Sequence, residues 1–115
     1  MKYCLETTDY ENNKVIFTEA QKQLKADKHP ELRDNNFING RVKQAINRPR
    51  FVYQDCDKPN SRKVFYMEEF VMNGKSRYTK VIIDFKKTPL FVVSAYRPDY
   101  VKERNKTKLL YGKDN

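Results

Sequence analysis

Residues 50–97 read RFVYQDCDKPNSRKVFYMEEFVMNGKSRYTKVIIDFKKTPLFVVSAYR, and this stretch decides the fold. It contains four runs rich in β-branched and aromatic residues, at 50–55, 63–71, 78–85 and 90–97. Between them lie the short polar segments CDKPNS, NGKS and KKTP, whose composition is typical of turns. Three short connections in succession predict a four-stranded antiparallel meander.

Side chains of a strand point alternately to its two faces, so the sequence also predicts which residues share a face. In the run 78–85 the apolar set is Thr79, Val81, Ile83 and Phe85. In the run 90–97 the alternation separates Phe91, Val93 and Ala95 from Val92, Ser94 and Tyr96. We therefore expect the face away from the helices to present Lys80, Ser94 and Tyr96 on adjacent strands.

Before the meander, KVIF at 14–17 predicts a short strand and Thr18 a helix N-cap. Thr18 and Gln21 have the spacing of a capping box, in which each side chain satisfies a free backbone N–H. A helix is expected from about Glu19 to Lys28, and Pro30 ends it because the residue before a proline avoids helical geometry.

A second helix is predicted within residues 31–49. Its apolar stripe has helical spacing, whereas Gly40 weakens it and Pro49 ends it; the stripe consists of Ile38, Val42, Ala45 and Ile46. The tail after residue 97 is basic, and a short helix, an edge strand and a loose end all remain open for it.

Together these elements predict one α+β domain over residues 1–115. A short N-terminal strand and two helices precede a four-stranded antiparallel meander, with the helices on one face of the sheet. The core is expected at about 14–100, and residues 101–115 form a basic tail.

The net charge of +9 on 115 residues favours a polyanionic partner such as RNA or DNA. Residues 58–115 carry fourteen Lys and Arg against six Asp and Glu, so the excess lies in the C-terminal half. A lysine-rich surface that only maintains solubility is the alternative. With no apolar run long enough for a membrane span and no signal peptide at the start, we expect a cytoplasmic protein without a membrane partner.

Known catalytic signatures are absent from the sequence, which has a single histidine, so a metal site and a cofactor are not expected. RNA carries its own nucleophile, the 2′-hydroxyl, and its cleavage needs a base, an acid and cations. His29 suits proton transfer at neutral pH. Arg62, Lys80 and Arg97 are candidate phosphate ligands, and Tyr66 and Tyr96 can stack on bases. Alternatively, His29 only interacts with the last carbonyls of its helix.

The order of the motifs resembles that of the barnase–EndoU–colicin–RelE-like nuclease superfamily, in particular its small phage- and bacterial-type domains. The resemblance spans about residues 14–100 and rests on KHPEL, AINRPRFVYQD, SRKVFYMEEF, TKVIIDF and LFVVSAYRPDY in that order. It implies a metal-independent ribonuclease, often deployed as a toxin. In this likeness His29 matches the helix-end histidine, Arg62 the basic residue before the second meander strand, and Ser94 and Tyr96 the hydroxyl positions of the last strand.

The leading hypothesis is therefore an endoribonuclease that cleaves RNA through 2′-hydroxyl attack. His29, Ser94 and Tyr96 are its catalytic residues, and its substrate-binding residues are Arg62, Tyr66, Lys80 and Arg97. Two alternatives are a nucleic-acid-binding module without catalysis and a domain that binds an acidic protein. A toxin would also need an acidic antitoxin or immunity protein as a partner.

Overall fold

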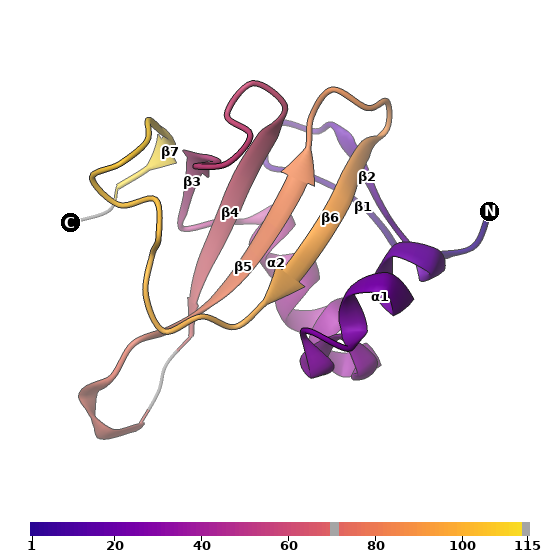
Figure 1. Ribbon diagram of the computed structural model, residues 1–115, viewed down its shortest axis with the longest axis horizontal. Helices are drawn as coiled ribbons and strands as arrows, with labels where there is room; N and C mark the ends of the chain where they lie inside the picture. Colours follow the sequence, from indigo (N-terminus) through magenta and orange to yellow (C-terminus); the bar gives the residue numbers. More distant parts are fainter. Residues whose placement is uncertain (70–71, 114–115) are drawn as a thin grey trace.

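Seven strands form one mixed sheet in the computed structural model, which describes residues 1–69 and 72–113 (Figure 1). The strands are β1 (Tyr3–Thr8), β2 (Lys14–Thr18), β3 (Phe51–Gln54), β4 (Arg62–Glu69), β5 (Arg77–Asp84), β6 (Leu90–Tyr96) and β7 (Leu109–Gly112). Their spatial order is β1-β2-β6-β5-β4-β3-β7. The β2–β6 pair is parallel and the other pairs are antiparallel.

The sheet is larger than the sequence predicted. Strands β3 to β6 pair antiparallel in chain order, but β1 was not predicted and β7 corresponds to one of three possibilities left open for the tail. The run expected at 63–71 begins one residue earlier, at Arg62, and β4 is described as far as Glu69. Residues 70 and 71, the end of that predicted run, lie outside the described residues.

Two α-helices lie within the described part of the chain, α1 (Glu19–Ala26) and α2 (Lys43–Asn47). Between them are a 3₁₀ turn, η1 (Pro30–Arg33), and a π-helical segment, η2 (Phe37–Val42). A further 3₁₀ turn, η3 (Met72–Gly74), precedes β5. The single second helix expected here is thus a π-helical segment followed by a short α-helix, and Gly40, the residue that weakened the prediction, lies inside the π-helical part.

Apolar side chains gather in two clusters on opposite faces of the sheet. The helix-side core combines residues of both α-helices with one face of the strands, and it includes Ala26, Ala45, Ile46, Phe65, Val81 and Ala95. The aromatic cluster on the other face consists of Phe51, Tyr53, Val64, Tyr66, Tyr78 and Val101. Val92 belongs to the helix-side core, although strict alternation grouped it with Ser94 and Tyr96. The pairing of β5 with β6 shifts register between Ile82 and Ile83, which breaks that alternation.

Residues 97–108, which we call the strap, connect β6 with β7 (Figure 1). Because these strands lie on opposite sides of β5, β4 and β3 in the sheet, the strap has to cross from one to the other. Val101 of the strap is buried in the aromatic cluster. The tail therefore covers part of the sheet face that carries no helix.

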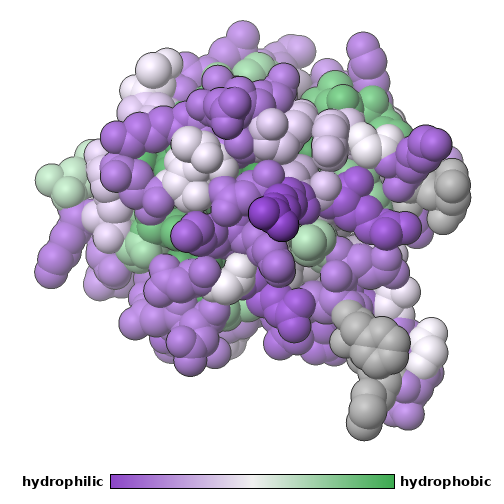
Figure 2. All heavy atoms as spheres, turned by 180° about the vertical axis from the view of Figure 1, so that it is seen from behind, coloured by the Kyte–Doolittle hydropathy of each residue, from purple (hydrophilic) through white to green (hydrophobic). Residues whose placement is uncertain are grey.

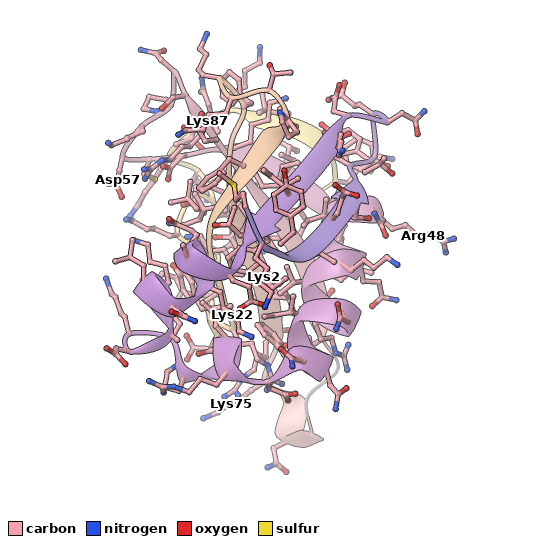
Figure 3. All side chains as sticks on the ribbon, turned by 90° about the vertical axis from the view of Figure 1, so that its right-hand side faces the viewer. Lys2, Lys22, Arg48, Asp57, Lys75 and Lys87 are labelled. Atoms are coloured by element: carbon pink, nitrogen blue, oxygen red, sulfur yellow. The ribbon has the colours of Figure 1, made fainter. Side chains whose placement is uncertain are left out.

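The surface is rich in charge. Seen from behind, the molecule is mainly hydrophilic, with several hydrophobic areas between the charged side chains (Figure 2). Lys75 and Lys87, both from the C-terminal half, extend at opposite ends of the molecule (Figure 3). Over residues 1–69 and 72–113, no helix is both long and apolar enough to span a membrane.

Candidate functional site

His29 lies between α1 and η1, and Pro30 determines its backbone. Its amide still donates to the carbonyl of Lys25 in a helical pattern, at 2.9 Å. Its own φ and ψ, −127° and 82°, are not helical, as expected for a residue that precedes proline. Helix α1 ends before His29, at Ala26 and not at about Lys28 as predicted, and the imidazole is held where the chain turns into η1.

Two hydrogen bonds near the start of helix α1 fix its cap and attach it to β6. The Thr18 hydroxyl accepts from the backbone N–H of Gln21 at 3.1 Å, which confirms Thr18 as the N-cap. The Gln21 side-chain amide was expected to complete a capping box, but it donates to the carbonyl of Val93 at 2.7 Å. Strand β2 pairs with β6 only at Leu90 and Phe91. Further along this side of β6, the Gln21 side chain supplies the hydrogen bond to the Val93 carbonyl.

The imidazole of His29 stacks on the ring of Tyr96, the last residue of β6. The two ring centres are 4.2 Å apart and the planes differ by 4°. His29 is half-buried, and this burial is the main reason why its pKa is lowered from 6.5, against an opposing effect of Glu31. The neutral imidazole is therefore the favoured form at neutral pH.

Lys80 lies opposite Tyr96 in the register of β5 and β6. Its Nζ is 5.5 Å from the centre of the Tyr96 ring and 5.6 Å from that of Tyr66. Since the His29 ring centre is 4.2 Å from the same Tyr96 centre, the imidazole centre and Lys80 Nζ are at most 9.7 Å apart, the sum of 4.2 and 5.5 Å. The structure thus brings together four of the predicted residues: His29, Tyr66, Lys80 and Tyr96.

Glu103 of the strap completes this group, and the sequence analysis missed it. Its carboxylate accepts from Lys80 Nζ at 3.2 Å and forms a short hydrogen bond with the Tyr66 hydroxyl. The side chains of Lys80 and Glu103 are 4% and 0% exposed. Burial raises the pKa of Tyr66, and the hydrogen bond to Glu103 raises it further, so the phenol stays a proton donor. The one available signal was that Glu103 is the only acidic residue between 100 and 113.

Ser94 lies two residues before Tyr96 on β6, opposite Ile82 in the register. It is 5% exposed, and its hydroxyl has no hydrogen-bond partner among the described residues. A buried hydroxyl without a partner is costly in free energy, by about 1–3 kcal/mol. Ser94 therefore provides an unused donor on β6, on the same face of the strand as Tyr96 and two residues from it.

Arg62 and Arg97 lie apart from this group. Arg62 begins β4, four residues before Tyr66, which corresponds to about 13 Å along the strand. Arg97 follows Tyr96, but its guanidinium donates to the Glu69 carboxylate through Nε at 2.9 Å and through a second nitrogen at 3.2 Å. Arg41 of η2 also contacts Glu69, at 3.2 Å. To bind a phosphate, as predicted, Arg97 would have to give up a two-point ion pair with a buried carboxylate.

Glu69 also contributes to the lining of a cleft of about 770 Å³. It is lined by Arg48, Arg50, Met67, Glu68, Glu69, Gly74, Lys75 and Ser76. The sequence analysis did not single out any of these residues. Arg50 is paired with Glu68 at 3.4 Å, so the lining contains its own ion pair.

Comparison of the chain with protein-family models, curated proteins and solved structures gives no match. No cluster of three or more His, Cys, Asp or Glu side chains placed to hold a metal ion occurs within residues 1–69 and 72–113. The candidate site consists of the side chains of His29, Tyr66, Lys80, Ser94, Tyr96 and Glu103.

Proposed function

We propose that this protein is a metal-independent endoribonuclease of the barnase–EndoU–colicin–RelE-like superfamily, acting as a toxin-like enzyme on RNA. The observation that carries the proposal is that His29 stacks on Tyr96, whose register partner on the neighbouring strand is Lys80. This arrangement joins a neutral imidazole, a phenol and an ammonium group, which are the groups that cleavage through the 2′-hydroxyl requires.

In the proposed reaction the imidazole of His29 accepts the proton of the 2′-hydroxyl. The 2′-oxygen then attacks the adjacent phosphorus, and the bond from phosphorus to the 5′-oxygen breaks. Tyr96 gives a proton to the departing oxygen, while Lys80 and Ser94 stabilise the charge on the phosphate. The products are a 2′,3′-cyclic phosphate and a free 5′-hydroxyl. The proton taken up by His29 then passes to the Tyr96 oxygen through solvent, so atoms and protons balance without an added cofactor.

The role of His29 can be tested with purified protein and RNA in the presence of EDTA. We expect cleavage with 2′,3′-cyclic phosphate ends, identified by mass spectrometry, and a loss of about 10²-fold or more in His29→Ala. Lys28→Ala, at the exposed neighbouring residue, is the matched control and should cleave like the parent. Intact RNA with the parent protein, or equal rates for His29→Ala and the parent, would refute the proposal.

A second candidate is a nucleic-acid-binding module without catalysis. It is favoured by the ion pairs that hold Lys80 to Glu103 and Arg97 to Glu69, because two of the three predicted phosphate ligands already have an anionic partner and are not free to stabilise a reacting phosphate. This module would bind RNA with strong salt dependence and release no products. In either case, the exposed basic residues suit an acidic protein partner such as an antitoxin or an immunity protein. Growth arrest on induction, relieved by His29→Ala, would favour the toxin.

A further inference from the structure

We propose that the Glu103 carboxylate occupies the position of a substrate phosphate, so that the strap has to release Lys80 before a nucleic acid can bind to the sheet. The identity of the ligand as RNA rests on the proposed function. The occupied anion site itself rests on contacts in the molecule, which are described next.

The site is built from donors that face one anion. Lys80 Nζ donates to one oxygen of Glu103 and the Tyr66 hydroxyl to the other. Both donors come from neighbouring strands of the sheet, where Tyr66 and Lys80 lie opposite each other. Tyr66 is fully buried and Lys80 is 3% exposed, so their positions are fixed by packing. Hydrogen bonds to a charged acceptor in such surroundings are strong, and a phosphate oxygen can accept from the same two donors.

Ser94 supplies the second observation. Its hydroxyl is buried on the face of β6 that carries Tyr96, yet it has no partner among the described residues. Lys80 and Tyr66 each donate to one oxygen of the Glu103 carboxylate, and Ser94 donates to neither. A tetrahedral phosphodiester has oxygens in more directions than a planar carboxylate. In the proposed complex one of them accepts from Ser94, which satisfies a hydroxyl that the carboxylate leaves without a partner.

The attachment of the strap is compatible with its release. Apart from Glu103 and Val101, which are buried, its residues are exposed or partly buried. Two further ion pairs between described residues hold the strap. Arg97, at the start of the strap, contacts the buried carboxylate of Glu69 at 2.9 Å and stays in place in this inference. Nearer to Glu103, the pair between Lys102 and Asp57 at 3.4 Å is exposed, and such pairs contribute about 0–1 kcal/mol. The basic residues beside Glu103, namely Lys102, Lys106 and Lys108, attract the same polyanion that would displace the carboxylate.

A 2′-O-methyl oligonucleotide, which lacks the nucleophile and cannot be cleaved, tests the inference by affinity alone. Glu103→Gln keeps the shape and the acceptor for Tyr66 but removes the competing charge. We expect it to bind about tenfold more tightly than the parent, equivalent to about 1.4 kcal/mol. Asp57→Asn removes one negative charge from the exposed pair of the strap and is the control, with an affinity close to that of the parent. Equal gains in the two variants would overturn the inference, because the effect would then be one of net charge.

The double variant Lys80→Met/Glu103→Gln separates the site from the rest of the surface. It should lose the tenfold gain, since the ammonium that binds the anion is absent. If it binds as tightly as Glu103→Gln, the oligonucleotide does not use Lys80 and the inference is wrong.

A measurement on the unaltered protein avoids any effect of substitutions on folding. The backbone N–H groups of Lys106 and Thr107 donate to the carbonyl of Glu103, at 3.0 and 3.1 Å. Their hydrogen exchange should become faster when the oligonucleotide is bound, and unchanged protection at saturation would overturn the inference. None of these readouts requires cleavage. A protein that binds as expected and cuts no RNA would refute the proposed enzyme and not the anion site.

Discussion

His29 and Tyr96 lie face to face, with ring centres 4.2 Å apart and planes 4° from parallel. The two residues are far apart in the sequence, one before η1 and the other at the end of β6. Their contact joins the helical layer to the sheet at the strand end where α1 terminates. It also brings the only histidine of the chain to the edge of a buried ion pair.

Stability should depend on pH through His29. Because burial lowers its pKa below 6.5, the folded state binds fewer protons than the unfolded state in this range. The resulting stabilisation is present above pH 6.5 and is lost as the pH falls through the lowered pKa. Denaturation in urea between pH 7 and pH 5 should show a larger loss for the parent than for His29→Gln, which cannot titrate. Parallel pH profiles for the two proteins would contradict this expectation.

Removal of the Tyr96 ring should raise the pKa of His29. In Tyr96→Ala the imidazole loses its stacking partner and becomes more exposed to water, so its pKa should move toward 6.5. Tyr96→Phe keeps the ring and is the matched control. NMR titration of the imidazole protons measures the pKa in all three proteins, and an unchanged value in Tyr96→Ala would show that the stack does not cause the shift.

The pair of Lys80 and Glu103 should show strong coupling in stability. Lys80→Met or Glu103→Gln alone leaves a buried charge without its partner, at a cost of about 3–5 kcal/mol. The double variant removes both charges and should recover most of this loss. Urea denaturation gives the free energies of unfolding for the cycle. Lys63→Met is the control, because its pair with Glu11 is partly exposed and 3.8 Å long, and it should change stability by less than about 1 kcal/mol. Additive losses in the cycle would rule out the coupling.

Arg62 should affect long substrates more than short ones. It lies about 13 Å along β4 from Tyr66, so a dinucleotide bound at His29 does not reach it. Arg62→Ala should leave dinucleotide cleavage unchanged, weaken the binding of longer oligonucleotides, and reduce the salt dependence by about one phosphate contact. Cleavage of dinucleotides and affinity at several salt concentrations test this. A large loss on the dinucleotide would mean that Arg62 contacts the reacting phosphate.

The meander and the start of α1 could be predicted from local patterns. Strand periodicity between turn segments defined β3 to β6, and Thr18 is the N-cap of α1 as its position before Glu19 suggested. The hairpin of β1 and β2 was missed, although DYENN carries a turn signal: the Asp9 carboxylate accepts from the backbone of Glu11 and Asn13, and Asn12 adopts a positive φ of 67°. Polar residues alternate with few apolar ones in YCLETT, which made this edge strand hard to recognise.

The candidate site could be predicted in part, for a physical reason. Facing positions on adjacent strands follow from register, so Lys80 and Tyr96 were placed together correctly. The contact of Glu103 depends on how the tail crosses the sheet, and no local periodicity encodes such a crossing. Arg97 was predicted as a phosphate ligand, but its guanidinium pairs with Glu69, and strand periodicity gives no information on that partner.

The attachment of the strap at its β7 end depends on the absence of a side chain at Gly112. Its φ is +84°, and a methyl group on its α-carbon would come within 2.1 Å of the Arg50 carbonyl oxygen. Strand β7 docks on β3 only because this residue has no side chain. A single added methyl group at residue 112 would therefore separate β7 from β3, and the strap would then be attached to the sheet at its β6 end only. The cover over the aromatic face of the sheet therefore depends on a glycine at its distant anchor as well as on the contacts of the strap itself.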